Sequence, residues 1–173
     1  MNARPGPGRP LRVLVMNGPN LNLLGTREPA IYGLETLADI GEALRVRAAE
    51  LRVEIAFYQS NHEGALIDRL HQRDFDASIV NAGGLTHTSV SLRDALLGIK
   101  RPFVEVHLSD PSTREPFRQV NFLEDIALAR FVGMKAAGYH RALEELARRW
   151  EVGEIAPRAV EGASGGGEEP SDA

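Results

Sequence analysis

The sequence predicts an α/β protein in which a five-stranded parallel sheet is covered by helices on both faces. Short apolar runs alternate along the chain with segments that repeat apolar residues at helical spacing. Repeated strand–helix units favour right-handed crossovers and the strand order 2-1-3-4-5, which is common for five parallel strands. A chain of 173 residues is long enough to bury one sizeable core.

The expected strands are short and apolar, and each helix between them has one apolar face that is expected to pack on the sheet. The strands are residues 11–17, 52–58, 77–81, 102–107 and a weaker run near 128–133. The apolar faces carry Leu37, Leu44, Ala48 and Leu51 in the first helix, Leu92, Ala95, Leu96 and Ile99 in the third, and Tyr139, Leu143, Leu146 and Trp150 in the last.

The two ends of the chain differ in composition from the middle. Residues 1–10 are rich in Pro and Gly, and residues 153–173 include a Gly-rich acidic run. The first is expected to be a disordered extension and the second a flexible acidic tail, which leaves 11–152 as the expected folded unit.

Composition excludes several classes of protein. The net charge is −4 and the arginines form no basic stripe, which argues against a nucleic-acid partner. The chain has no cysteine, so disulfides, thiol nucleophiles and thiolate metal sites are excluded. Because no apolar run could span a membrane and the first residues lack the apolar core of a secretory signal, a soluble cytoplasmic protein is expected.

Polar side chains follow three of the expected strands at the point where each ends. Residues 17–25 follow the first strand, 81–89 follow the third and 105–109 end the fourth. Ligands of open α/β sheets bind outside the carboxyl ends of the strands. With Arg27 and Tyr32 nearby in the sequence, we therefore expect these strand ends, which bear Asn, His, Arg and Tyr, to form one polar site.

The connection between the first strand and the first helix is long for a compact domain, at about 16 residues from 18 to 33. It carries Arg27 and Tyr32, which favours a lid over the site. A phenol is a poor base at neutral pH, but a neighbouring guanidinium stabilises the phenolate and lowers its pKa. Arg27 can supply this to Tyr32; the alternative is an ordinary surface or core tyrosine.

Glu105 and His107 are two residues apart on a strand and therefore share a face. A carboxylate beside an imidazole orients the ring and favours its protonated form, which suits a general acid. The alternative is a strand-end salt bridge. His87 follows a Gly-Gly turn and either binds substrate or lies in a helix cap, for which its hydroxyl-bearing neighbours are suited.

Arg114 and Arg118 are one helical turn apart and can meet an anionic substrate, although a solvated face is the alternative. The sequence favours neither a metal nor a nucleotide, because the Glu105–His107 pair has no evident third ligand and no phosphate-binding glycine motif is present. Lys100 and Lys135 do not lie in apolar strand interiors, which disfavours Schiff-base chemistry.

Taken together, these residues resemble the type II 3-dehydroquinate dehydratases over about 11–150. The blocks that carry the resemblance are NGPNLNLLGTREPAIYG (17–33), QSNHEG (59–64), NAGGLTHTSVSLRDAL (81–96), EVHLS (105–109) and REPFR (114–118). The resemblance implies a flavodoxin-like three-layer sandwich that needs no metal or cofactor and forms dodecamers of four trimers. It implies a lyase that converts 3-dehydroquinate to 3-dehydroshikimate by reversible anti elimination of water through an enolate. The pathway would be shikimate and aromatic amino acid biosynthesis or quinate catabolism.

The resemblance also implies residue roles. Tyr32, as a tyrosinate, would take the proton from C2 of the substrate, with Arg27 lowering its pKa. Asn20 would donate toward the developing enolate oxygen, directly or through a water. His107, oriented by Glu105, would protonate the departing C1 hydroxyl.

The remaining implied roles concern binding. The side chains of Asn81, His87 and Arg118 would bind the ring hydroxyls. The backbone N–H groups of Leu108 and Ser109 would bind the carboxylate. Asp94 would complete the site of a neighbouring subunit.

A binding or regulatory module without turnover is a second interpretation, although binding alone needs neither an acid nor a base. A flavin-binding electron carrier is a third, disfavoured because the loop after the first strand is poor in hydroxyls.

The chain departs from the usual pattern of these enzymes in three places. They are residues 110–115, the Asn121-Phe122 pair where Ser-Tyr is common, and the thinned glycine segment 132–139. None of these positions is the proposed acid or base. The departures concern subunit contacts and the carboxylate side of the site.

Overall fold

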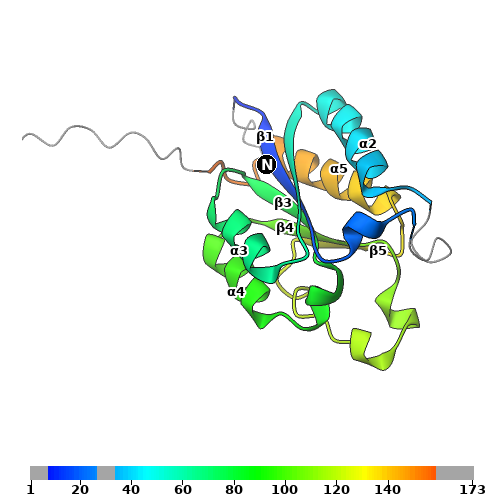
Figure 1. The fold of residues 1–173 in the computed structure, drawn as a ribbon. Helices are drawn as coiled ribbons and strands as arrows, with labels where there is room; N and C mark the ends of the chain where they lie inside the picture. Colours follow the sequence, from blue (N-terminus) through cyan, green and yellow to red (C-terminus); the bar gives the residue numbers. More distant parts are fainter. Residues whose placement is uncertain (1–7, 27–33, 159–173) are drawn as a thin grey trace, which may run out of the picture.

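Five parallel strands form one sheet in the order β2-β1-β3-β4-β5 in the computed structural model, which describes residues 8–26 and 34–158 (Figure 1). The predicted strand order is confirmed, and every strand lies within one residue of its expected bounds. The strands are β1 (Leu11–Asn17), β2 (Val53–Gln59), β3 (Ala77–Asn81), β4 (Phe103–His107) and β5 (Ala129–Val132).

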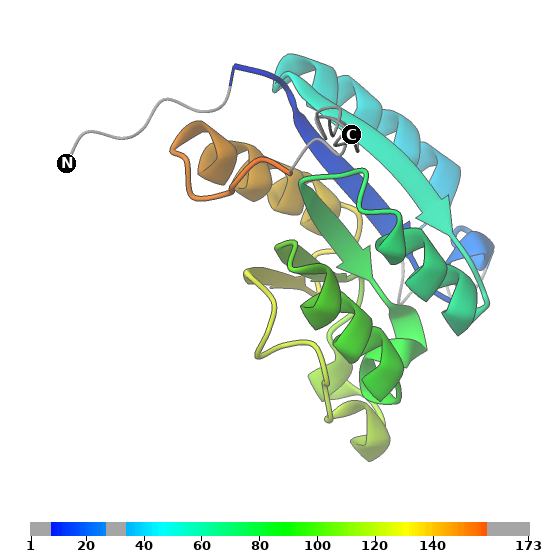
Figure 2. The same cartoon turned by 90° about the vertical axis from the view of Figure 1, so that its left-hand side faces the viewer.

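Helices cover both faces of the sheet (Figures 1 and 2). One face is covered by α2 (Leu37–Glu50) and α5 (Ala137–Glu151), and the other by α3 (Glu63–His71) and α4 (Val90–Ile99). The apolar stripes expected from the sequence face these two cores, with Leu37 and Leu51 only partly buried. None of the helices in the described part of the chain has the length and apolar character needed to cross a bilayer.

Local hydrogen bonds explain where two of the helices begin. At the start of α2, the Thr36 hydroxyl accepts from the Asp39 N–H at 3.1 Å, and the Asp39 carboxylate accepts from the Thr36 N–H at 2.9 Å, a capping box. At the start of α4, the Ser89 hydroxyl accepts from the Leu92 N–H at 2.8 Å. Ser89 is therefore the cap, and His87 lies before it, at the end of the 3₁₀ turn Gly83–His87.

A buried carboxylate joins both ends of the described chain at the amino-terminal edge of the sheet. Asp76 is fully buried and accepts from two guanidinium nitrogens of Arg9, at 2.6 and 2.7 Å, and from the backbone N–H of Arg12 and Arg158. Burial alone would raise the pKa of Asp76, but these donors and the Arg9 charge hold it below its usual value. Packed residues thus continue past the expected unit of 11–152 at both ends.

Candidate active site

The chain segments that follow β1 and β3 are in close backbone contact beneath the site. Gly18 donates its N–H to the carbonyl oxygen of Asn81 at 2.8 Å. A Cβ atom at Gly18 would stand 2.3 Å from the carbonyl oxygen of Ala82, so only glycine allows this approach. Two residues later the chain turns at Asn20, which has a left-handed backbone with φ 68° and whose N–H donates to the Asn61 side chain at 2.9 Å.

A pocket with about 160 Å³ of free space opens at this edge of the sheet. It brings together residues from the ends of β1, β3 and β4 and from the connection after β4. Its lining consists of Pro19, Asn20, Leu21, Leu24, Asn81, Gly83, Gly84, His87, His107, Leu108, Ser109, Pro111, Arg114 and Arg118. Residues that follow three strands are therefore brought together at one pocket, as expected from the strand ends.

Most of the predicted site residues that the structure describes line this pocket, and two of them do not. Glu105 lies behind His107, fully buried in β4. Asp94 is exposed on α4 and is not part of the lining. Arg27 and Tyr32 lie outside the described residues, so the proposed base and its activator stay predictions.

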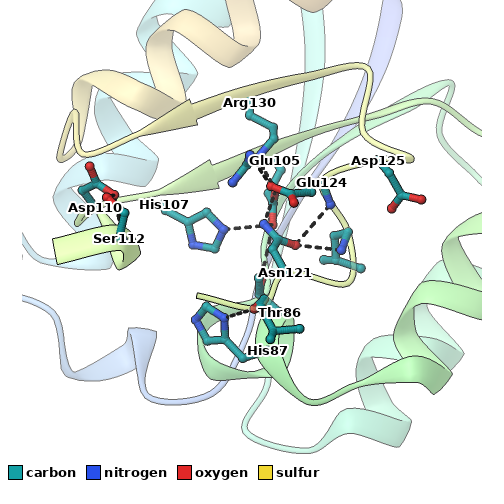
Figure 3. Close-up of polar contacts among 12 residues, drawn as sticks. Thr86, His87, Glu105, His107, Asp110, Ser112, Asn121, Glu124, Asp125 and Arg130 are labelled. Atoms are coloured by element: carbon teal, nitrogen blue, oxygen red, sulfur yellow. Dashed lines mark hydrogen bonds and ion pairs between the residues drawn. The ribbon is translucent and has the colours of Figure 1, made fainter. Parts of the chain in front are cut away.

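His107 and Glu105 form the contact that their spacing predicts. The Nε2 atom of His107 lies 2.8 Å from Oε1 of Glu105 (Figure 3). An ionised carboxylate only accepts hydrogen bonds, so Nε2 carries a hydrogen. Nδ1 is then the ring nitrogen that can exchange a proton with a molecule in the pocket.

The Glu105 carboxylate is surrounded by donors. Asn121 donates its amide to both carboxylate oxygens at 3.0 and 2.9 Å, Arg130 donates Nε at 2.9 Å, and the Thr86 hydroxyl lies 3.4 Å away. Burial alone would raise the pKa of Glu105, but the hydrogen bond and charge of His107, the Asn121 amide and the Arg130 charge hold it below its ordinary value. Glu105 is therefore an ionised carboxylate fixed in one orientation.

Sequence reasoning missed both Asn121 and Arg130. Asn121 is one of the departures from the usual pattern, and although it is neither the proposed acid nor the base, it touches the carboxylate that orients the acid. Arg130 is the register partner of Glu105 across β4 and β5. Only knowledge of that register would have identified the pair, because β5 is the weakest strand signal in the sequence.

His87 is held by the backbone of the segment after β4. Its Nδ1 lies 2.6 Å from the carbonyl oxygen of Val120, which can only accept, so Nδ1 carries the hydrogen. In the neutral ring Nε2 is then an acceptor. The ring is stacked on His107 with centroids 6.4 Å apart and planes inclined by 18°. The binding alternative for His87 is supported by this placement, since Ser89 provides the helix cap.

Arg114 and Arg118 bring positive charge to one side of the pocket. Arg118 closes the 3₁₀ turn Pro116–Arg118 and donates Nε to Glu115 at 2.7 Å. Arg114 lies between this turn and the preceding one, Pro111–Thr113. The segment that was expected to be one helical turn thus forms two short 3₁₀ turns. Both arginines nevertheless line the pocket, and their positive charges suit an anionic ligand.

A buried hydrogen-bond chain behind the pocket fixes the orientation of Asn81. The Tyr139 hydroxyl donates to Oδ1 of Asn17 at 2.5 Å and accepts from Nδ2 of Asn81 at 2.8 Å. Oδ1 of Asn81 accepts from the Gly83 N–H at 3.3 Å. Burial raises the pKa of Tyr139 well above its ordinary value, against the effect of the Asn81 hydrogen bond, so this phenol is unsuited to act as a base.

Within residues 8–26 and 34–158 no group of three His, Asp or Glu side chains is arranged to hold a metal ion. The chemistry that the pocket offers is thus that of an oriented imidazole, two guanidinium-bearing residues and several amide groups.

Residues 11–147 match the family model described as dehydroquinase class II. The chain belongs to the class II dehydroquinase family. The matched segment includes the whole sheet and every residue that lines the pocket.

Named relatives of this dehydroquinase chain cover nearly the full length of its folded part. A catabolic 3-dehydroquinase of Verticillium alfalfae is 48% identical over 143 residues, which are 82% of this chain and 95% of the relative. A 3-dehydroquinate dehydratase of Sodalis glossinidius is 52% identical over 139 residues, 79% of this chain and 93% of the relative. Among solved structures, a type II dehydroquinase from Butyrivibrio crossotus superposes with a TM-score of 0.77 at 37% identity, covering 79% of this chain and 97% of the other.

Proposed function

We propose that this chain is a 3-dehydroquinate dehydratase, a lyase that removes water from 3-dehydroquinate to give 3-dehydroshikimate by anti elimination. The observation that carries the proposal is the buried Glu105–His107 pair, whose ring opens onto a pocket with an amide at Asn20 and cations at Arg114 and Arg118. A pocket that only bound a ligand would need no oriented proton donor.

Elimination begins with removal of a proton from C2, beside the ketone. We assign this step to Tyr32 as a tyrosinate, with Arg27 lowering its pKa. Both residues lie outside the described part of the chain; the assignment is supported by their place in the sequence, a few residues after Asn20 and Leu24 of the pocket lining. Asn20, also at the rim, is assigned to donate toward the enolate oxygen as negative charge grows there.

The second half of the reaction is loss of the C1 hydroxyl. His107 gives the proton on Nδ1 to the leaving oxygen, so water departs and the electron pair of the enolate forms the new carbon–carbon double bond. The fixed anion of Glu105 stabilises the charged ring before transfer. The net reaction moves one proton from the substrate to Tyr32 and one from His107 to the leaving water, and exchange with solvent restores both groups.

Substrate positioning is assigned to the remaining pocket residues. Asn81, His87 and Arg118 are proposed to bind the ring hydroxyls, and the N–H groups of Leu108 and Ser109 the carboxylate. The Tyr139 hydrogen bond supports the assignment for Asn81, and the Val120 hydrogen bond supports that for His87, because each holds its side chain in one orientation beside the pocket.

Assembly is also part of the proposal. We infer a homo-oligomer, a dodecamer of four trimers in the cytoplasm, in which Asp94 completes the site of an adjacent subunit. Asp94 is exposed on α4 between Val90 and Leu97, whose side chains are exposed apolar groups at 55% and 48%. These three residues share a helix face, and an exposed apolar face beside a carboxylate suits a contact with a second copy of the chain. The partner of the site is the small-molecule substrate, and neither nucleic acid nor membrane is involved.

The decisive test is an assay with purified protein and 3-dehydroquinate, followed by the absorbance of the conjugated enone product. Absorbance should grow with the native protein and should grow far more slowly, by a factor of at least about 100, with His107→Gln. Substrate binding without growth of absorbance would instead identify a binding module.

A further inference from the structure

The Glu105 carboxylate is placed so that one of its oxygens meets only donors. Oε2 lies 2.9 Å from Nδ2 of Asn121 and 2.9 Å from Nε of Arg130. Asn121 cannot turn its amide around, because its Oδ1 accepts from the backbone N–H groups of Leu123 at 2.7 Å and Glu124 at 3.1 Å. A proton on Oε2 would face two other hydrogens, so the arrangement fits an anion alone.

Arg130 connects this buried anion to the surface. Its side chain is 34% exposed, and its second donor, Nη1, lies 2.7 Å from Glu124, which is half exposed. The four side chains His107, Glu105, Arg130 and Glu124 therefore alternate in charge when the imidazole is protonated, from the pocket to solvent (Figure 3).

We propose that Asn121 and Arg130 are positioning residues for His107: Asn121 fixes the Glu105 carboxylate toward the ring, and Arg130 sets how strongly that carboxylate favours the charged ring. The proposal rests on the proposed function, in which His107 is the acid. Arg130 offsets part of the negative charge of Glu105 and repels a positive ring, so it makes the ring release its proton more readily. Glu124 in turn offsets part of the charge of Arg130.

Other charged or titratable groups also face the pair, and they stay unchanged in the variants described below. They are His87 on the 3₁₀ turn before α4, Asp110 after β4, and Arg114 and Arg118 in the pocket wall.

The two charge variants should move the pH profile in opposite directions. In Arg130→Gln, the alkaline limb of kcat/KM, where the acid loses its proton, should move to higher pH by about 0.5, the size expected for a partly exposed ion pair. In Glu124→Gln the Arg130 charge is less offset, so the same limb should move to lower pH by a smaller amount. Arg130→Lys keeps the charge and should return the limb to its native position.

Arg12→Gln is a matched control. Arg12 on β1 donates to its register partner Glu54 on β2 at 2.6 Å, as Arg130 does to Glu105 across β5 and β4. The control removes one positive charge from a cross-strand ion pair at the other end of the sheet. Its alkaline limb should coincide with that of the native enzyme.

Asn121→Ala tests the effect of the orientation of the Glu105 carboxylate, because it changes no charge. Without its amide the carboxylate keeps Arg130 but loses the donor that spans both oxygens, so the ring is held less firmly. We expect kcat to fall roughly 10-fold with KM nearly unchanged, since the acid acts on the leaving group and not on binding.

A measurement without substrate separates this proposal from the proposed function. The NMR titration of the His107 ring, assigned by its loss in His107→Gln, should show the same opposite displacements in Arg130→Gln and Glu124→Gln. If His107→Gln keeps turnover, the assignment of the acid fails, while the ring titration still tests the coupling. The proposal is overturned if the titration of the His107 ring is unchanged in both variants, or moves in the same direction in both. If Arg130→Gln does not fold, the surface substitution Glu124→Gln still provides the test.

Discussion

The amide of Asn81 donates to the hydroxyl of Tyr139 at 2.8 Å, although the two residues are 58 positions apart and Tyr139 is completely buried in α5. This bond joins a helix on one face of the sheet to the carboxyl end of the central strand β3. Through this bond, a residue of the buried core orients a side chain that lines the pocket.

Tyr139→Phe should destabilise the protein by about 1–3 kcal/mol, because it leaves the polar atoms of Asn17 and Asn81 without a buried partner. Activity should also fall, since Asn81 is no longer held in one orientation. Urea denaturation and steady-state kinetics measure the two effects. Tyr58→Phe, at a half-buried position on β2, is the control and should cost less than about 0.5 kcal/mol. Equal stability of the two variants would show that the buried bond contributes nothing.

Asp76→Asn should lower the free energy of unfolding at pH 7 by about 2–3 kcal/mol, because the donors of Arg9, Arg12 and Arg158 lose an anionic acceptor. The pKa of Asp76 is lower in the folded than in the unfolded state, so its contribution is complete above the unfolded value near 3.9 and is lost as the pH falls through the folded value.

The native protein should therefore lose its advantage over Asp76→Asn as urea denaturation is repeated below about pH 4. Asp74→Asn, which removes a half-exposed carboxylate paired with Arg69, is the control and should differ little from the native protein at any pH. A difference between native protein and Asp76→Asn that stays constant down to pH 2 would contradict this account.

Tyr32→Phe should lose most turnover while still binding substrate, because it removes the oxygen that accepts the C2 proton. Arg27→Gln should instead move the acid limb of the kcat profile to higher pH, since the phenolate loses a stabilising charge. Isothermal titration with substrate and pH-dependent kinetics distinguish the two. Near-normal kcat in Tyr32→Phe would rule out the assignment of the base.

Chelators should leave the activity unchanged, and borohydride added with substrate should trap no adduct. The expectation rests on the Glu105–His107 pair as proton donor, which needs no Lewis acid and no lysine imine. Turnover after extensive dialysis against chelator and mass spectrometry after reduction are the measurements. Activity that is lost on chelation and restored by a divalent metal would refute this mechanism.

Asp94→Ala should weaken substrate binding or trimer formation without unfolding the protein, because Asp94 is an exposed carboxylate on α4. Mixing Asp94→Ala and Tyr32→Phe subunits should restore part of the activity, since some mixed sites carry both intact residues. Analytical ultracentrifugation and assays of the mixture test this. A fully active monomer, or no complementation after proven subunit exchange, would count against a shared site.

The strands and the Glu105–His107 contact could be predicted because each depends on local spacing. A run of apolar residues identifies a strand buried on both faces, and a period of two places residues 105 and 107 on one face. The partner Arg130 could not be predicted in the same way, because it depends on the register of β5 against β4. A shift of one residue would turn Arg130 to the opposite face.

The contacts between residues farthest apart in the sequence could not be predicted from it, for a different reason. Asn17 and Tyr139 are 122 positions apart, and each fits a simpler local interpretation, as a turn residue and as an apolar helix position. Arg9 lies in a Pro- and Gly-rich segment whose composition suggests disorder, and nothing local indicates that a buried carboxylate binds it. Such contacts satisfy buried polar groups and become visible only when the chain is folded.

The Asp76 contacts have a practical consequence. Arg9 and Arg158 both bind the Asp76 carboxylate, just before the start of β3. The described chain therefore begins and ends at the same place, at the opposite end of the strands from the pocket. A purification tag, a fluorescent fusion or a resin tether joined directly to residue 8 or residue 158 would start from this place, away from the pocket. A short linker that joins residues 8 and 158 would yield a circularly permuted enzyme whose new termini can be opened in a surface turn.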